Sequence, residues 1–293
     1  MNKSEYNKHS HSKHNFLQRR HGVRPDANNE QFLSNLSAAI RNNELQLHYQ
    51  PRYDSLSGHA NILEALVRWE RPGLGTFYPN TFLRAAETHG LIFALDLWVF
   101  EQCCKDLIQY RKTLSPQLKI AVNISSLDCE SVYYSQKLID LCNHYQLKLA
   151  DFIFEISETH AINDIRKTIA FCKTLNEYNT RFCLGGFGTG YASIIRLLEL
   201  PTHYLEIDYS FISQIGESEH SETIIKNILK LARTLRLKTI AVGVEHKYQY
   251  DFLMAAGCDL MQGFYFISPG EINPGITNKI NKSSLFMSDK KKF

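Results

Sequence analysis

The sequence lacks the features that mark several classes of protein. Its seven cysteines form no C-x-x-C pair, and an odd number with no secretory signal ahead of it argues against a disulfide scaffold. No apolar run is long enough to cross a bilayer, since the longest, residues 90–100, is interrupted by Asp96. We therefore expect a reduced, cytoplasmic protein with no membrane partner.

The chain also lacks a strong net charge, because its formal value is only +3. Residues 1–28 carry six basic against two acidic side chains and residues 278–293 carry five against one, so the segment between them is negative overall. A histidine-containing tail could bind metal or nucleic acid, but short polar ends of this kind are more often solvated arms. We expect a disordered basic tail at 1–28, a folded domain at 29–272 and a basic C-terminal tail at 273–293.

Within the folded domain, apolar runs rich in β-branched residues alternate with segments of helical spacing. The runs are 45–53, 62–69, 119–125, 152–157, 181–187, 204–209, 239–245 and 260–266. The helical segments include 80–87, 95–107, 135–144, 165–178 and 222–235. Eight strands with intervening helices predict an α/β fold, a TIM-type (βα)8 barrel. Only residues 54–60 join the first two runs, which is too short for a parallel crossover, so we expect an antiparallel first strand.

Polar side chains occur late in most of these runs, where a barrel of this type places its functional groups. They are Gln50, Glu64, Arg68, Asn123, Glu155, Glu158, Glu206, Asp208, Glu245 and Gln262. A buried carboxylate or amide is costly unless it meets a partner or a ligand. One such group could be a satisfied core residue, whereas the whole series predicts a site at the barrel mouth.

Seven short motifs, in order along the chain, resemble those of the EAL-domain family of cyclic di-GMP phosphodiesterases. They are Y-Q-P at 49–51, E-A-L-V-R-W at 64–69, V-N-I-S at 122–125, E-I-S-E-T at 155–159, L-G-G-F-G-T-G-Y at 184–191, G-C-D at 257–259 and Q-G-F at 262–264. The resemblance covers roughly residues 30–270 and implies a bacterial signalling protein built on the barrel expected above.

The resemblance also implies a two-metal hydrolytic site. In the family, the residues matching Glu64, Asn123 and Glu155 bind the metal ions together with the two aspartates of D-D-F-G. A lysine in the family's L-K-I-D holds the attacking water, and a glutamate of its A-E-G-V-E belongs to the same site.

This chain departs from the family pattern at four of those positions. Gly185 and Gly186 replace the two aspartates, Glu206 replaces the lysine and Val242 replaces the first glutamate of A-E-G-V-E. Hard ions such as Mg²⁺ need carboxylate ligands, and losing one preorganised electrostatic group typically costs about 100- to 1,000-fold in rate. We therefore expect a degenerate, catalytically inactive member with no Mg²⁺ or Mn²⁺ site. The vestigial ligands are Glu64, Asn123, Glu155 and Asp208.

Cyclic di-GMP binding without metal is an open alternative. The candidate groove, on the family pattern, consists of Gln50, Glu64, Leu66, Arg68, Asn123, Glu155, Glu245 and Gln262. Arg68 suits a phosphate because a guanidinium offers paired donors. Against binding, Glu64, Glu155 and Glu206 would place about three negative charges near a dianion, each pair about 4 Å apart costing roughly 4 kcal/mol.

A separate feature is the loop that follows the lost aspartates. Its residues are Phe187, Gly188, Thr189, Gly190 and Tyr191, and in the family it couples the site to dimerisation, anchored by the glutamate that matches Glu158. Its retention predicts a homodimer surface or a conformational switch. Equally, the two glycines could be kept because they satisfy the backbone of a turn.

These observations favour a non-catalytic bacterial regulator that contacts a protein partner and indirectly affects motility, biofilm or virulence-gene expression. The alternatives are a metal-independent cyclic di-GMP receptor and, more remotely, a weak phosphodiesterase acting through the vestigial ligands. About 28 leading residues are too few for a cyclase, sensor or helix-turn-helix domain, so we expect no direct DNA binding.

Overall fold

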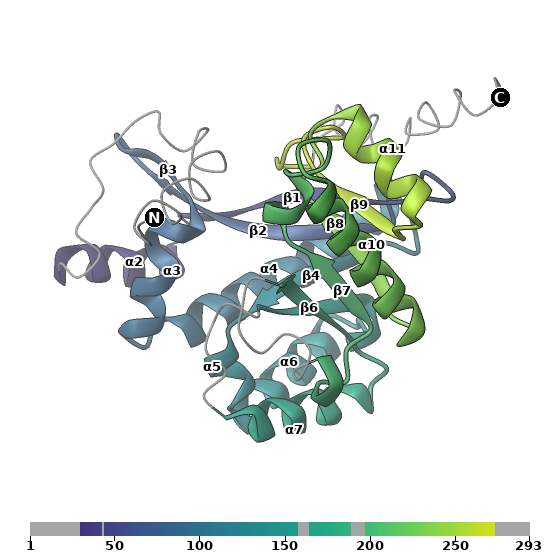
Figure 1. Cartoon of the computed structure of the whole chain (residues 1–293). Helices are drawn as coiled ribbons and strands as arrows, with labels where there is room; N and C mark the ends of the chain where they lie inside the picture. Colours follow the sequence, from purple (N-terminus) through teal and green to yellow (C-terminus); the bar gives the residue numbers. More distant parts are fainter. Residues whose placement is uncertain (1–29, 43, 158–163, 189–196, 273–293) are drawn as a thin grey trace, which may run out of the picture.

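The computed structural model describes residues 30–42, 44–157, 164–188 and 197–272, and eight of its strands close into a barrel surrounded by helices (Figure 1). The strands are β1 (Leu45–Asp54), β2 (Ile62–Arg71), β3 (Gly75–Phe77), β4 (Lys119–Ile124), β5 (Phe152–Ser157), β6 (Arg181–Phe187), β7 (Tyr204–Ile207), β8 (Lys238–Val242) and β9 (Leu260–Gln262). The predicted α/β barrel is confirmed. The tails predicted at 1–28 and 273–293 lie outside the described residues.

The first strand of the barrel is reversed, as predicted. β1 pairs antiparallel with both of its neighbours, β2 and β9, whereas the remaining barrel strands pair in parallel. β3 pairs with the outer end of β2 and takes no part in closing the barrel. In the register of the first hairpin, Gln50 lies opposite Glu64 and Arg52 opposite Ile62. The mouth is therefore lined by the carboxyl ends of the parallel strands and by the middle of β1.

Helices cover the outside of the barrel, with α4–α7 on one side and α10 and α11 on another (Figure 1). They are α2 (Glu30–Asn42), α3 (Pro79–Thr88), α4 (Ile92–Thr113), α5 (Ser126–Cys129), α6 (Val132–His144), α7 (Ile165–Asn176), α9 (Tyr209–Ile212), α10 (Glu219–Thr234) and α11 (Lys247–Ala256), with the 3-10 turn η1 (Leu149–Asp151). The five predicted helical segments are all present. No helix in the described part of the chain combines the length and the apolar character needed to cross a bilayer.

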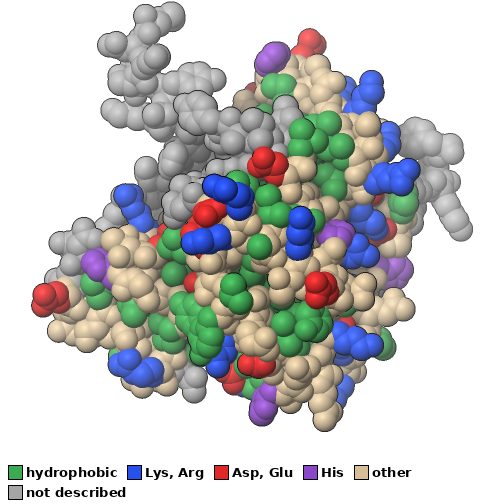
Figure 2. Space-filling view, turned by 90° about the horizontal axis from the view of Figure 1, so that it is seen from below, with side chains coloured by type: hydrophobic (Ala, Val, Ile, Leu, Met, Phe, Trp, Pro, Cys, Tyr) green, Lys and Arg blue, Asp and Glu red, His purple; other side chains and the backbone are tan. Residues whose placement is uncertain are grey.

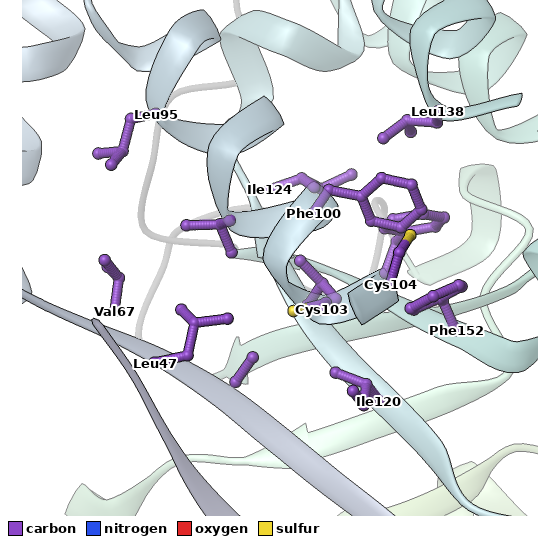
Figure 3. Packing of buried hydrophobic residues seen from close by; sticks show 14 of the residues in the cluster. Leu47, Val67, Leu95, Phe100, Cys103, Cys104, Ile120, Ile124, Leu138 and Phe152 are labelled. Atoms are coloured by element: carbon purple, nitrogen blue, oxygen red, sulfur yellow. The ribbon is translucent and has the colours of Figure 1, made fainter. Parts of the chain in front are cut away.

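The core between barrel and helices is aromatic and close-packed. Phe100 of α4 lies beside Phe152 and Phe154 of β5, with ring centroids 4.8 and 5.5 Å apart, and Figure 3 shows Cys104 and Leu138 next to it. All seven cysteines are buried and free, as the sequence predicts for a reduced chain. This wall holds β4 and β5 against α4 and so supports the strands that carry Asn123 and Glu155.

Inside the barrel, the lower layer is apolar. It contains one residue from each of six strands, Ile62, Ala121, Ile153, Cys183, Ile240 and Leu260, with Tyr204 of β7 packed against them. Side chains alternate between the two faces of a strand, so the next inward position on each strand lies two residues later, one layer nearer the mouth. The candidate site is that next layer.

Candidate functional site

The layer at the barrel mouth is mostly polar. Its inward positions are Glu64, Asn123, Glu155, Gly185, Glu206, Val242 and Gln262, each two residues after a member of the apolar layer. Alternation along the strands brings to one level the three metal-ligand positions expected from the sequence and three of the four replaced positions. The fourth, Gly186, is one residue beyond this level on β6.

A buried arginine that the sequence analysis did not single out lies at the centre of this layer. Arg52 of β1 has no exposed side-chain surface, and its guanidinium forms a two-pronged ion pair with the carboxylate of Glu155. Its Nη2 also lies 3.3 Å from a carboxylate oxygen of Glu206 and 3.6 Å from one of Glu64. Its Nε donates to the side-chain oxygen of Gln262 at 2.7 Å. One guanidinium thus contacts groups from four other strands.

Hydrogen bonds join the amide side chains to the same cluster. Gln262 donates through Nε2 to Glu64 at 2.5 Å and to Gln50 at 2.9 Å. Asn123 donates to the other oxygen of Glu64 at 3.0 Å, and Gln50 donates to the backbone oxygen of Ile267 at 2.9 Å. Five of the eight predicted groove residues, Gln50, Glu64, Asn123, Glu155 and Gln262, therefore belong to one network.

The pKa values of the acidic groups reflect their burial. Burial and the charge of Glu155 raise the pKa of Glu206 to about 8, although Arg52 acts in the opposite direction. Burial also raises the pKa of Glu155, against the lowering effect of Arg52. The sequence predicts about three negative charges at this mouth, those of Glu64, Glu155 and Glu206. Arg52 offsets part of that charge, and these carboxylates hold its pKa above its usual value despite burial.

Comparison with known proteins identifies the family. Residues 33–269 match the family model of the EAL domain. The chain belongs to the EAL-domain family. Its members include proteins of cyclic di-GMP signalling, which the relatives below represent.

Two curated relatives come from Pseudomonas aeruginosa. The bifunctional diguanylate cyclase/cyclic di-GMP phosphodiesterase MucR is 33% identical over 239 residues, which is 82% of this chain and 35% of MucR. The cyclic di-GMP phosphodiesterase NbdA is 36% identical over 238 residues, which is 80% of this chain and 30% of NbdA. This EAL chain thus spans about a third of the length of these relatives.

Solved structures agree with the fold. The MucR phosphodiesterase in complex with cyclic di-GMP superimposes with a TM-score of 0.77 at 32% identity, over 82% of this chain and 97% of that one. The EAL domain of FimX from Pseudomonas aeruginosa bound to cyclic di-GMP has a TM-score of 0.75 at 23% identity, over 81% of this chain and 96% of that one. The FimX likeness supports the fold alone.

Within this EAL domain, the end of β6 carries no side chain into the cluster. Gly185 is buried and Gly186 has φ +68°, at a point where the pairing between β6 and β7 shifts register. The backbone N–H of Gly186 donates to Glu206. At the two positions where the resemblance implies carboxylates, this chain therefore presents backbone groups.

Four of the predicted site residues have other neighbours. Arg68 donates to its neighbour's carbonyl, Val67 O, at 2.9 Å and lies over the ring of Tyr78, 5.0 Å from its centroid. Asp208 accepts from the N–H of Ser210 at 2.8 Å and so caps α9.

The other two are Leu66 and Glu245. Leu66 is half-buried on β2, opposite His48 of β1. The backbone N–H of Glu245 donates to Gln249 at 2.8 Å, and its carboxylate raises the pKa of Tyr209, for which burial is the larger cause. These two residues lie outside the Arg52 network formed by the described residues.

Only part of the predicted loop switch can be placed. Phe187 is buried in the hydrophobic cluster under α10, and Gly188 has φ +95° beside the ring of Phe211. Glu158, Thr189, Gly190 and Tyr191 lie outside the described residues, so the switch stays a prediction.

Arg52 was missed although it lies near the end of its run, residues 45–53, and later in it than Gln50. On the reversed strand the mouth corresponds to the middle of the run, and the Cα of Arg52 pairs with Ile62 of the apolar layer. Its long side chain then reaches up one layer to the carboxylates. Alternation with Gln50, two residues earlier on the same face, was the signal that could have identified it.

Proposed function

We propose that this chain is a non-catalytic EAL-domain regulator that acts by contacting another protein. The observation that carries the proposal is the end of β6, where Gly185 and Gly186 bring no carboxylate to the mouth and the N–H of Gly186 binds Glu206. Glu206 itself stands where the resemblance implies a lysine, so the positive charge next to the expected water is missing. A hydrolytic site that acts as a unit does not tolerate such a combination of changes.

Support for protein contact comes from the segment after β4. Val132 at the start of α6 is 87% exposed and the adjacent Tyr133 is 58% exposed, with Leu127 of α5 also exposed. Hydrophobic side chains also lie exposed between charged ones on the face shown in Figure 2. Exposed apolar groups of this size are typical of contact surfaces when they cluster. We propose the α5–α6 segment as a contact surface for the partner.

A second candidate function, a metal-independent cyclic di-GMP receptor, is favoured by Arg68. Its guanidinium forms no ion pair within 4.0 Å among the described residues, and it lies on β2 two positions beyond Leu66 and four beyond Glu64. Burial lowers its pKa, yet an arginine stays charged at neutral pH. Its N–H donors other than the one bonded to Val67 O are therefore available to a phosphate, and Arg52 reduces the negative charge that would oppose a dianion.

Hydrolysis is tested with purified protein, cyclic di-GMP and either Mg²⁺ or Mn²⁺, with separation of the linear product by chromatography. We expect no product above the protein-free control. Metal-dependent turnover that disappears in Glu155→Gln would contradict the proposal. Calorimetric titration with cyclic di-GMP in EDTA then tests the receptor function, because binding that survives EDTA and is lost in Arg68→Ala would establish it.

An experiment in cells distinguishes the regulator function from the receptor function. Val132→Lys should abolish the protein's effect on a cyclic di-GMP-controlled output such as motility, while Arg68→Ala should leave it unchanged. Leu74→Lys is the matched control, since Leu74 is also exposed but lies in the turn between β2 and β3. The opposite pattern, with Arg68→Ala inactive and Val132→Lys active, would contradict the regulator function and support the receptor function.

A further inference from the structure

We infer that Arg52 takes the structural place of the divalent ions: it is a resident cation that holds the barrel mouth together without metal. This inference goes beyond the proposed function, because a protein that does not hydrolyse cyclic di-GMP could still bind metal. It rests on which atoms already occupy the oxygens of the remaining ligands.

Each oxygen of the two remaining glutamate ligands has a donor from the protein. Both oxygens of Glu155 accept from the two Nη atoms of Arg52. One oxygen of Glu64 accepts from Asn123 and the other accepts from Gln262, with Arg52 3.6 Å away. A metal ion coordinated by these oxygens would have to replace N–H donors that are already in hydrogen-bonding distance.

The charge of Arg52 also opposes a metal ion. A guanidinium is always protonated, and this one is fully buried among Glu64, Glu155 and Glu206. Two like charges a few ångströms apart in a buried site repel strongly, and Arg52 cannot be neutralised by losing a proton. The side chain is also anchored through Nε to Gln262, so it cannot withdraw without breaking that bond.

One further group of potential metal ligands lies in this region. Atoms of Glu155, Cys183 and Glu206 lie within 4.8 Å of one another. The thiol of Cys183 is buried and lies against Glu155. Because both glutamates already contact Arg52, this set is part of the same ion cluster.

The hydrogen-bond partners of Arg52 explain why an arginine can hold the barrel mouth together. A planar guanidinium carries five N–H donors, and those of Arg52 reach one amide oxygen and the carboxylates of Glu155 and Glu206. A lysine would provide the same charge at a single point and could not form the two-pronged pair with Glu155. The arrangement thus supplies both the charge and the fixed directions that metal coordination would otherwise provide.

The test compares Arg52→Gln with wild type in Mn²⁺ and in EDTA. Wild type should give no heat on titration with Mn²⁺ and the same melting temperature in both conditions. Removing one partner of a buried ion pair should lower the melting temperature of Arg52→Gln by about 10 °C in EDTA. Mn²⁺ should recover much of that loss, because the freed carboxylates can now coordinate it, and should bind at least tenfold more tightly than to wild type.

Arg111→Gln is the matched control, since Arg111 pairs with Asp151 at 2.8 Å outside the barrel mouth. It should be destabilised less and should not respond to Mn²⁺. If Arg52→Gln does not fold on expression, refolding from urea with and without Mn²⁺ decides: recovery only with Mn²⁺ supports the inference, and failure in both overturns it.

Two results would overturn the inference directly. One is Mn²⁺ binding to wild type that is lost in Glu155→Gln, and the other is a folded Arg52→Gln that Mn²⁺ neither binds nor stabilises. Failure here is distinguishable from failure of the proposed function. Wild type that binds Mn²⁺ without hydrolysing cyclic di-GMP refutes only the resident cation, whereas hydrolysis refutes the non-catalytic function as well.

Discussion

Asp96 of α4 and Asp128 of α5 are buried carboxyl groups that, unlike those at the barrel mouth, have no cationic partner within ion-pair distance among the described residues. Asp96 accepts from the backbone N–H of Ser125 at 2.9 Å. Asp128 has one oxygen without a hydrogen-bond partner in the described part of the chain. Burial raises the pKa of both, that of Asp128 to about 6, and the two side chains share a hydrogen bond. At the scale of single residues, this pair shows how burial raises the pKa of a carboxyl group that has no cationic partner. Glu155 would be in that situation without Arg52.

The shift of Asp128 predicts a specific pH dependence. A carboxyl group whose pKa is raised by folding contributes stability below its unfolded pKa, near 4, and that contribution is lost as pH rises through about 6. Asp128→Asn has no such group, so its free energy of unfolding relative to wild type should rise by about 1–3 kcal/mol between pH 4.5 and 7.5. Urea unfolding at the two pH values measures this change.

Asp151→Asn is the control of opposite sign. Burial would raise the pKa of Asp151, but the hydrogen bonds from Arg111 and from the backbone of Lys148, together with the charges of Arg111 and Lys119, outweigh it and the pKa is lowered. Its contribution is present above the unfolded pKa, so this variant should lose stability at pH 7.5. A difference between Asp128→Asn and wild type that is equal at both pH values would contradict the prediction.

At the scale of elements, the end of β9 depends on a close approach of two backbones. Gly263 follows Gln262 and has φ +157°, and a Cβ at this position would overlap the backbone nitrogen and carbonyl oxygen of Val244. The same backbones are hydrogen-bonded, with the N–H of Val244 donating to Gln262 O at 3.0 Å. Glycine is therefore required here to bring Gln262 within reach of Arg52.

Gly263→Ala should be strongly destabilising, by about 3 kcal/mol or more, because the clash is with backbone that cannot rotate away. Gly90→Ala is the control, since Gly90 has φ +72° with no atom near the added Cβ, and it should cost only about 1 kcal/mol. Thermal unfolding of both variants measures the difference. Equal losses would mean that backbone strain alone, and not the contact with Val244, explains the glycine.

At the scale of the whole molecule, the barrel brings together residues that are far apart in the sequence, and their charges must be considered as a set. Arg52 contacts Glu155 and Glu206, which are 103 and 154 residues away along the chain. The glycines at the end of β6 and the arginine of β1 therefore belong to one site. Introducing carboxylates at the end of β6 alone should not create a metal site.

We predict that placing the family's residues at positions 185, 186, 206 and 242 does not by itself create an active site. The variant Gly185→Asp, Gly186→Asp, Glu206→Lys and Val242→Glu should remain inactive with Mn²⁺ and cyclic di-GMP, because Arg52 still occupies the cluster. Adding Arg52→Gln as a fifth substitution should give metal-dependent formation of the linear product, at a rate at least tenfold above that of the quadruple variant. The control is Glu155→Gln added to the quintuple variant, which should remove that activity. Equal activity of the quadruple and quintuple variants would show that Arg52 is compatible with metal.

Much of the fold could be predicted from local patterns. The alternation of apolar runs and helical segments predicted the barrel, and the short connection at 54–60 predicted the reversed strand. The β3 strand and the helices α5 and α9 were missed because three or four residues are too few to show a period. The helix α2 has buried residues Phe32, Leu36 and Ala39 at helical spacing, so its pattern was present in the sequence and was overlooked.

The sequence by itself determined which residue types stand at the strand ends, including the glycines at 185 and 186 and the glutamate at 206, because strand period and motif order are local properties of the chain. Only the tertiary structure decided that Arg52 is the counter-ion of Glu155 and Glu206. Its contacts depend on the reversed direction of β1, on the register that places it opposite Ile62, and on the length of its side chain. Electrostatic pairing depends on distance in space, and only closure of the barrel sets that distance.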